Sequence, residues 1–211
     1  MDSMNNMISV VGVLDGNPAL DHTCMDTSLF TASLKVERLS GAVDMIPLMI
    51  PDNLVFLLPR DPEKPIMVSG QIRTYNKIVD GAGRLLVYLF VQNISEAEES
   101  DRCHNHVTVI GSICRPPVFR STPFGREISD VMLAVNRAYG KSDYVPCIAW
   151  GNNARYVASM GIGDRIRVTG RLQSRDYEKL MENGEYQRRT AYELSAFTIH
   201  PEPKDPAEVS A

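Results

Sequence analysis

Apolar and polar residues alternate along several stretches in the second half of the chain. Val107, Val109, Gly111 and Ile113 have the period of two that is typical of a half-buried strand. Similar stretches predict four further strands, at residues 131–135, 144–150, 165–172 and 190–199. Between the third and fourth strands, Asn152 to Met160 has helical spacing, opens with an asparagine cap and stops before Gly161.

Turn signals separate these stretches. Thr122-Pro-Phe-Gly125 combines a proline, which sets φ, with a glycine that accepts a positive φ. Asn183-Gly184 is a strong hairpin signal before the last strand. Five strands with a helix between the third and fourth are typical of a Greek-key barrel of the OB type.

The first half of the chain repeats this skeleton. Asn6–Gly12 matches Asn105–Gly111 at an offset of 99 residues. The same offset pairs several further positions, among them Arg38 with Arg137, Asp44 with Asp143 and Pro47 with Pro146. At an offset of 100, Val68–Ile72 matches residues 168–172. One register held over so many positions indicates a duplication.

The chain is therefore predicted to be all-β, with two tandem five-stranded OB-fold barrels. Residues 1–96 form the first domain, 97–104 a polar linker, 105–200 the second domain and 201–211 a flexible, acidic, proline-rich tail. In the first domain the helix, at residues 51–58, is weakly predicted, and Asp80-Gly81 is predicted to turn the last hairpin.

Charge is distributed unevenly between the two repeats. The chain has a net charge of −4, from 22 Lys and Arg against 26 Asp and Glu. Residues 1–104 carry 8 basic and 14 acidic residues, whereas residues 105–200 carry 13 basic and 9 acidic ones. Of those 13 basic residues 11 are arginine, whose planar guanidinium suits phosphates and base stacking. This asymmetry favours a polyanion partner for the second repeat, although chance scatter between two solvated surfaces gives the same counts.

Other functional classes find little support in the sequence. Cys24, Cys103, Cys114 and Cys147 form no CxxC pair, and Cys103-His-Asn-His106 fits no zinc spacing, so no metal is expected. No nucleophile–base arrangement, P-loop or Rossmann glycine pattern indicates an enzyme or a cofactor. No apolar run is long enough to span a membrane, and no signal peptide precedes the first strand, so a cytoplasmic location is expected.

Six motifs in one order give the second repeat a family resemblance. They are Asn105-x-Val-x-Val-Ile-Gly111, Ser121-Thr-Pro-x-Gly125, Leu133-Ala-Val-Asn-Arg137, Cys147-Ile-Ala-Trp-Gly151, Ala154-x-x-Val-Ala158 and Gly163-Asp-Arg-Ile-Arg-Val-Thr-Gly-Arg-Leu-Gln-Ser-Arg175. Together they resemble the bacterial single-stranded DNA-binding protein family, and the first repeat is similar to a diverged copy. The resemblance implies a non-enzymatic OB-fold protein that binds single-stranded DNA. It also implies a homodimer, because the family presents about four OB folds.

The resemblance assigns a DNA-binding role to residues of the second repeat. Stacking aromatics are expected at Tyr139, Tyr144, Trp150 and Tyr177. Cations for phosphates or stacking are expected at Arg137, Arg171 and Arg175, with Arg115, Arg120, Arg126 and Lys141 on neighbouring loops and Arg188 on the last hairpin. Core packing is the competing interpretation for a strand aromatic such as Trp150, and Tyr156 on the predicted helix is expected to pack.

The first repeat lacks these aromatics. At the matching positions it has Ser40, Met45, Pro51 and Lys77. It is therefore expected to be a structural and dimerisation module, with at most a residual DNA contact through Arg73, Tyr75 and Lys77. The chain also lacks the acidic tip with which many family members recruit other proteins, so such recruitment is in doubt. The alternatives are an OB-fold accessory protein of replication or recombination and a protein-interaction scaffold with weak DNA binding.

Overall fold

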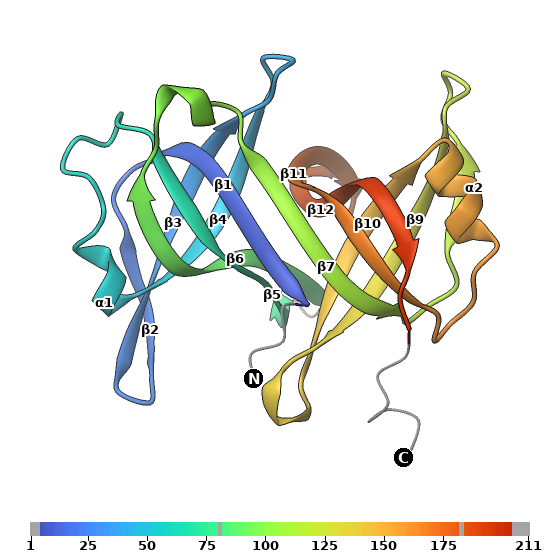
Figure 1. Ribbon diagram of the computed structural model, residues 1–211, viewed down its shortest axis with the longest axis horizontal. Helices are drawn as coiled ribbons and strands as arrows, with labels where there is room; N and C mark the ends of the chain where they lie inside the picture. Colours follow the sequence, from blue (N-terminus) through green and yellow to red (C-terminus); the bar gives the residue numbers. More distant parts are fainter. Residues whose placement is uncertain (1–4, 80–81, 182–183, 204–211) are drawn as a thin grey trace.

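Two β-barrels stand side by side in the computed structural model, which describes residues 5–79, 82–181 and 184–203 (Figure 1). The first contains β1 (Asn6–Leu14), β2 (Ala19–Cys24), β3 (Thr27–Glu37), β4 (Val43–Pro51), α1 (Asp52–Val55), β5 (Ile66–Val79) and β6 (Ala82–Glu96). After the 3₁₀-helix η1 (Glu99–Asp101), the second contains β7 (Asn105–Ile113), β8 (Val118–Ser121), β9 (Glu127–Asn136), η2 (Ala138–Gly140), β10 (Ser142–Trp150), α2 (Asn152–Ala158), β11 (Arg165–Leu180) and β12 (Tyr186–Pro201).

The strands form one twelve-stranded sheet with a symmetric order, in which each strand of the first domain and its counterpart in the second lie at the same distance from the middle. It runs β2-β3-β4-β6-β5-β1-β7-β11-β12-β10-β9-β8, and each half closes on itself through β1–β3 or β7–β9. The β4–β6 and β10–β12 pairs are parallel. A five-stranded barrel with this closure is the OB fold, so the prediction of two tandem OB folds is confirmed.

The core of each barrel comes from the alternation that predicted the strands. Along β7, Val107, Val109 and Ile113 point inward and are at most 1% exposed, whereas His106 is exposed. The same positions of the first domain, Ile8, Val10 and Leu14, are also buried. Burying one such side chain stabilises the fold by about 1.5–3 kcal/mol, which explains why the repeat keeps these positions apolar.

Matching glycines allow the long strands to bend within the barrel. The β5–β6 and β11–β12 pairings shift register at Ser69/Gly70 and Thr169/Gly170, as at a β-bulge. A Cβ on Gly70 would lie 2.0 Å from the carbonyl oxygen of Phe90, and one on Gly170 would lie 2.1 Å from that of Ser195. Only glycine fits this close approach, so both repeats have a glycine there.

An asparagine of each repeat continues the ladder beyond the bulge. The Asn6 side chain donates to the Ile72 carbonyl at 2.7 Å and accepts from its N–H at 2.9 Å. Asn105 makes the same two bonds with Leu172, at 2.8 and 3.0 Å. The shared Asn at the start of the first-strand motif is therefore a structural residue.

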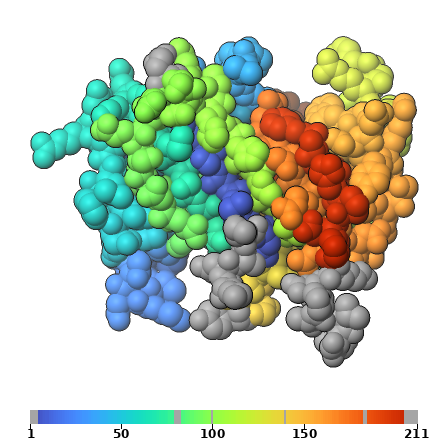
Figure 2. Space-filling model, in the orientation of Figure 1, coloured from blue at the N-terminus to red at the C-terminus, as the bar shows by residue number. Residues whose placement is uncertain are grey.

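The two domains join through β1 and β7. These strands pair antiparallel from Asn6↔Val109 to Val10↔Asn105. In the space-filling view β1 (blue) lies against β7 (green) across the middle of the molecule (Figure 2). Helices α1 and α2 lie on opposite outer flanks (Figure 1). The chain is thus arranged like a symmetric dimer in which the two subunits are linked.

Several element boundaries differ from those predicted. Each domain has a sixth strand, β2 or β8, whose residues are all exposed and so give no alternation to read. Helix α2 is capped at Gly151 without a side-chain hydrogen bond, so the predicted asparagine cap at Asn152 is wrong. The predicted turn at Thr122–Gly125 is confirmed, with Gly125 at φ 73°.

The last strand extends beyond residue 200, the predicted end of the second domain. Pro201 pairs with Ile166 in the sheet. Glu202 accepts hydrogen bonds from Arg167 at 2.8 and 3.1 Å, and these lower the pKa of its carboxyl. The predicted turn Asp80-Gly81, Asn183 of the other hairpin turn and tail residues 204–211 lie outside the described residues.

Candidate nucleic-acid interface

Strand β10 presents a row of side chains on the outside of the second barrel. Tyr144, Pro146 and Trp150 lie on one side of the strand and Asp143, Val145, Cys147 and Ala149 are buried on the other, whereas Ile148, between Pro146 and Trp150 on the first side, is also buried. Tyr144 is 43% exposed and Trp150 is 38% exposed. The two rings therefore share one face of the strand, about 20 Å apart along it. Exposed aromatics on a common face are suited to stacking on unpaired bases.

The neighbouring strands place a further exposed residue near this row. Trp150 lies opposite Ile128 of β9, which is 2% exposed, and Ile128 lies opposite the exposed Arg120 of β8. Two aromatics that were not predicted as site residues lie in the same hairpin, Phe119 at 44% and Phe124 at 91% exposure. The sequence signal for them is slight, because β8 shows no alternation and Phe124 occupies a turn.

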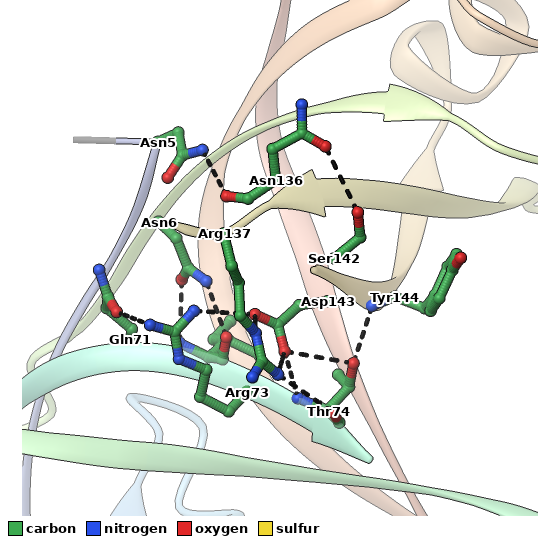
Figure 3. A network of polar contacts seen from close by, with 11 residues as sticks. Asn5, Asn6, Gln71, Arg73, Thr74, Asn136, Arg137, Ser142, Asp143 and Tyr144 are labelled. Carbon is green, nitrogen blue, oxygen red and sulfur yellow. Dashed lines mark hydrogen bonds and ion pairs between the residues drawn. The ribbon is translucent and has the colours of Figure 1, made fainter. Parts of the chain in front are cut away.

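The first domain holds the start of β10 through a polar cluster (Figure 3). We call Asp143, Arg137, Arg73 and Thr74 the Asp143 cluster. The buried Asp143 carboxylate accepts from the Thr74 N–H at 2.6 Å and from Arg73 Nη1 at 2.9 Å, and Arg137 binds both of its oxygens. The Thr74 hydroxyl in turn accepts from the N–H of Tyr144 at 2.7 Å. The Tyr144 ring points away from the cluster (Figure 3), so the first domain fixes its backbone and leaves its face free.

A matching cluster holds the first domain against the second. In the Asp44 cluster, made by Asp44, Arg38 and Ser174, the buried carboxylate accepts from the Ser174 N–H at 2.7 Å and from Arg38 at 2.6 and 2.7 Å. The Ser174 hydroxyl accepts from the N–H of Met45 at 3.0 Å. This cluster has one arginine, because Gln173 stands where the other domain has Arg73, and Gln173 donates to Glu193 at 2.9 Å instead.

These contacts change the interpretation of Arg137. Its guanidinium is three-quarters buried against Asp143 and also donates to the Thr74 carbonyl at 3.2 Å. The hydrogen bond to Asp143 raises the pKa of Arg137, as that to Asp44 raises the pKa of Arg38. Arg137 is thus committed to the domain junction and is poorly placed to neutralise a phosphate. Its counterpart Arg38 persists in the repeat that lacks the stacking aromatics, which is the sequence signal for a structural role.

Arg171 and Arg175 lie at different depths on β11. The Arg171 guanidinium lies 5.9 Å from the centre of the Phe197 ring, and loss of solvent lowers its pKa. Arg175 is about half exposed, 5.7 Å from the Tyr177 ring and 3.7 Å from Glu193. Arg175 is therefore the more accessible of the two to a phosphate.

The remaining predicted cations divide into paired and unpaired groups. Arg120 binds Asp130 at 3.0 Å, and Arg188 binds Asp176 at 2.6 Å. Arg115, Arg126 and Lys141 are exposed, and none of the three forms an ion pair within the described residues. The unpaired group retains its full charge for an anionic ligand.

The predicted aromatics do not all gather in one place. Tyr177 is 37% exposed and lies near the C-terminal end of β11. It lines a groove together with Tyr75 and Arg84 of the first domain. Tyr139 lies in η2, and its side chain is outside the described residues. Of the four predicted aromatics, Tyr144 and Trp150 alone lie together on the outward face of β10. No described helix has the length and apolar character that a membrane span requires.

Sequence comparison finds relatives of the second domain. Residues 104–201 match the profile described as "Single-strand binding protein family". A Single-stranded DNA-binding protein of Bacillus cereus is 36% identical over 81 residues, which are 35% of this chain and 48% of the relative. Single-stranded DNA-binding protein A of Bacillus subtilis is 33% identical over 102 residues, 45% of this chain and 57% of the relative. The chain thus spans about half the length of the curated relatives it matches.

Structural comparison covers both domains. The wild-type single-stranded DNA-binding protein of Thermus aquaticus superposes with a TM-score of 0.75 at 20% sequence identity, over 95% of this chain and 94% of that one. At this identity the likeness extends to the fold alone, and it includes both OB folds in their relative placement. The second OB fold of this chain, residues 104–201, is thus similar to the single-strand binding protein family, and the whole chain shares the fold of the Thermus aquaticus protein.

Proposed function

We propose that the chain binds single-stranded DNA without strong sequence preference and protects it during replication, recombination or repair. The observation that carries the proposal is the exposure of Tyr144 and Trp150 on one outward face of β10. Unpaired DNA offers flat bases and a charged backbone, and stacking on an aromatic is worth about 1–3 kcal/mol per base. The unpaired cations Arg115, Arg126 and Lys141, with Arg175, supply positive charge in the same domain.

The binding surface is proposed to lie mainly on the second domain. The first domain has Met45 and Pro51 at the positions of Tyr144 and Trp150, so its outer face offers no ring for stacking there. Its clearest contribution to this site is through Thr74, which holds the N–H of Tyr144. Because the domains share one sheet, the first domain positions the platform that the second presents.

We also infer that two chains assemble into a homodimer with four OB folds. The outer face of the shared sheet carries exposed apolar residues, among them Met7 at 46% and Phe197 at 54% exposure. A second copy would cover such residues. Sedimentation equilibrium tests this, since a dimer has twice the 23.5 kDa of one chain. A mass of one chain at micromolar concentration contradicts the inference.

The fluorescence of Trp150 tests DNA binding directly, because it is the chain's only tryptophan. Oligo-dT is added to the full chain at low and at moderate salt. Saturable quenching that weakens with salt supports a base on the Trp150 ring, because phosphate contacts make binding salt-dependent. Unchanged fluorescence with no mobility shift of the oligonucleotide contradicts the proposal and favours an OB-fold scaffold for protein partners.

A further inference from the structure

The two domains carry equivalent hairpins of opposite charge, β2–β3 in the first and β8–β9 in the second. We call residues 19–28, which are β2, the turn after it and the start of β3, the acidic hairpin. Their counterparts at the repeat offset of 99 are residues 118–127. The ladders agree with this offset, because Leu20 pairs with Phe30 and the equivalent residues of the second domain pair in the same way. The two hairpins lie on opposite sides of the molecule, and the β2–β3 turn projects beyond its barrel (Figure 1).

The acidic hairpin lacks the cations of its counterpart. Asp21 stands at the position of Arg120, and Thr27 stands at that of Arg126. Asp21 and Arg120 are both exposed, so neither charge is needed inside a barrel. The same exposed positions are thus cationic in one domain and acidic or neutral in the other, which suits them to ligands of different charge.

Two further carboxylates extend the negative charge. The exposed Asp26 lies in the turn, and Asp52 of α1 lies beside the hairpin, where its carboxylate accepts a hydrogen bond from the Ser28 N–H at 3.1 Å. Asp21 lies 2.5 Å from His22. Within the described residues, no lysine or arginine forms an ion pair with any of these three carboxylates. The hairpin therefore has negative charge available to a cationic partner.

Large exposed apolar side chains accompany these carboxylates. Leu20 is 61% exposed and stands at the position of Phe119, and Met25 is 95% exposed and stands at that of Phe124. Phe56, at the end of the neighbouring α1, is 77% exposed. The hairpin thus keeps apolar residues where the second domain has rings. A flexible thioether adapts to apolar surfaces of many shapes, and methionine is common at surfaces that bind proteins.

The conformation of the turn is unfavourable for Met25. Its φ is 47° and that of Asp26 is 65°. A two-residue hairpin turn with two positive φ angles favours glycine, asparagine or aspartate, and methionine is uncommon there. Because Met25 is almost fully exposed, packing within the fold offsets little of this strain. A contact outside the chain therefore explains the residue better than the fold does.

Strand β2 also offers an open edge. It comes first in the order of the sheet and pairs with β3 alone among the described strands. All six of its residues are exposed, and none is proline or lysine, which commonly block pairing at the edge of a sheet. An extended segment of another protein is able to pair along such an edge through its main chain.

Charge decides between the possible occupants of this surface. DNA is an anion, and a second copy of the chain brings the same three carboxylates to the same edge, so both are repelled. A segment that carries lysine or arginine between apolar residues complements the carboxylates and also covers Leu20 and Met25. The acidic hairpin therefore fits a basic, partly apolar protein segment.

We propose that the acidic hairpin binds an extended segment of another protein in which lysine or arginine alternates with apolar residues. The inference goes beyond the proposed function and does not depend on it, because the hairpin belongs to the first domain and the stacking face to the second. It gives the first domain a ligand of its own.

The test measures binding of a synthetic peptide to the full chain by fluorescence anisotropy. The labelled probe has about nine residues, longer than the six of β2, with lysine and valine alternating. A peptide with glutamate in place of lysine is the charge control and is expected not to bind. For the double variant Asp21→Asn, Asp26→Asn we expect about 2- to 30-fold weaker binding, the loss of two exposed ion pairs. The matched double variant Asp61→Asn, Glu63→Gln removes two exposed charges of the same domain outside the hairpin and keeps wild-type binding.

The two double variants separate a site from general attraction. Unchanged affinity of the Asp21→Asn, Asp26→Asn variant overturns the proposal. Equal weakening in both double variants also overturns it, because the peptide then responds only to the overall charge. Asparagine accepts the positive φ at position 26, so the variant is expected to keep the wild-type unfolding temperature. It is also expected to bind oligo-dT at least as tightly as wild type. Failure of the unmodified chain to bind oligo-dT overturns the proposed function and leaves this proposal standing.

Hydrogen exchange locates the contact independently. The unmodified chain is exchanged with and without the lysine peptide, and its fragments are analysed by mass spectrometry. Slower exchange at residues 19–28 supports the proposal, because the bound segment covers the edge of β2. Slower exchange confined to other parts of the chain overturns it.

Discussion

Ile8 of β1 lies directly opposite Val107 of β7, and these two residues are each other's counterparts in the internal repeat. Only the pair on a two-fold axis can have this relationship in an antiparallel ladder. The junction of the two domains is therefore an isologous contact, of the kind found in symmetric dimers, made within one chain. The Asp143 and Asp44 clusters lie on either side of this axis and follow the same symmetry.

Asp143→Asn is expected to destabilise the chain by about 3–5 kcal/mol, because removing one partner leaves buried or half-buried charges uncompensated. Two arginines, Arg137 and Arg73, lose their counter-charge in this variant. Asp44→Asn removes the counter-charge of Arg38 only, so it is expected to lower the free energy of unfolding by less. Urea unfolding measures both free energies.

The exposed Glu63→Gln is the control for these charge changes and is expected to alter the unfolding free energy by less than about 0.5 kcal/mol. Equal losses for Asp143→Asn and Asp44→Asn would show that Arg73 adds nothing to the Asp143 cluster.

Tyr144→Ala is expected to raise the Kd for oligo-dT by about 5- to 150-fold, which corresponds to the 1–3 kcal/mol of one stacked base. Tyr156→Ala is the matched control. Tyr156 is a tyrosine of nearly equal exposure, 39% against 43%, but it lies on α2 rather than on β10. Anisotropy titration checks both, and a similar loss for Tyr156→Ala would place the binding face elsewhere.

Salt dependence is expected to separate the unpaired cations from the paired ones. Replacing Arg126 or Lys141 with alanine lowers the slope of log K against log salt by about 0.7 for each phosphate that the side chain neutralises in the wild type. Arg188→Ala has a smaller effect, because Asp176 already neutralises Arg188 at 2.6 Å. Titrations between low and moderate salt give the slopes, and identical slopes for all variants would remove these cations from the interface.

Alkaline pH is expected to weaken the fold through Cys147. Burial raises the pKa of its thiol, so above about pH 8.5 the unfolded chain loses this proton while the folded chain keeps it. The Cys147 thiol therefore leaves the free energy of unfolding unchanged below about pH 8.5. Above that pH it lowers this free energy by up to about 1.4 kcal/mol per pH unit. Urea unfolding between about pH 7 and 9.5 under reducing conditions tests this: the advantage of wild type over Cys147→Ala should shrink as pH rises. A constant difference contradicts it.

The sequence predicts the parts of this fold that depend on local burial. Val107 to Ile113 alternates because one face of β7 packs in the barrel, and the repeat then extends the interpretation to the first domain. β2 and β8 were not predicted, because strands exposed on both faces show no alternation of apolar and polar residues. The asparagine cap failed because Gly151 takes the cap position with its backbone alone, at φ 54°.

The candidate site was predictable only where it follows strand geometry. Tyr144 and Trp150 are six residues apart on one strand, so their common face follows from the period of two. Arg137 also binds Thr74, 63 residues away in the other repeat, and no local pattern predicts this contact across the domain junction. The same holds for the groove that Tyr177 lines with Tyr75 and Arg84, because its residues come from two domains.

Joining the two halves of the dimer-like junction in one chain changes what a single substitution does. In a dimer of identical chains every substitution at the two-fold contact is made twice, and both copies must tolerate it. Here a change such as glutamine at position 173, where the other repeat has arginine at position 73, occurs once and meets only one partner. Because the two domains are fused in one chain, their sequences can differ at equivalent positions. One domain is therefore able to specialise while the other stays unchanged.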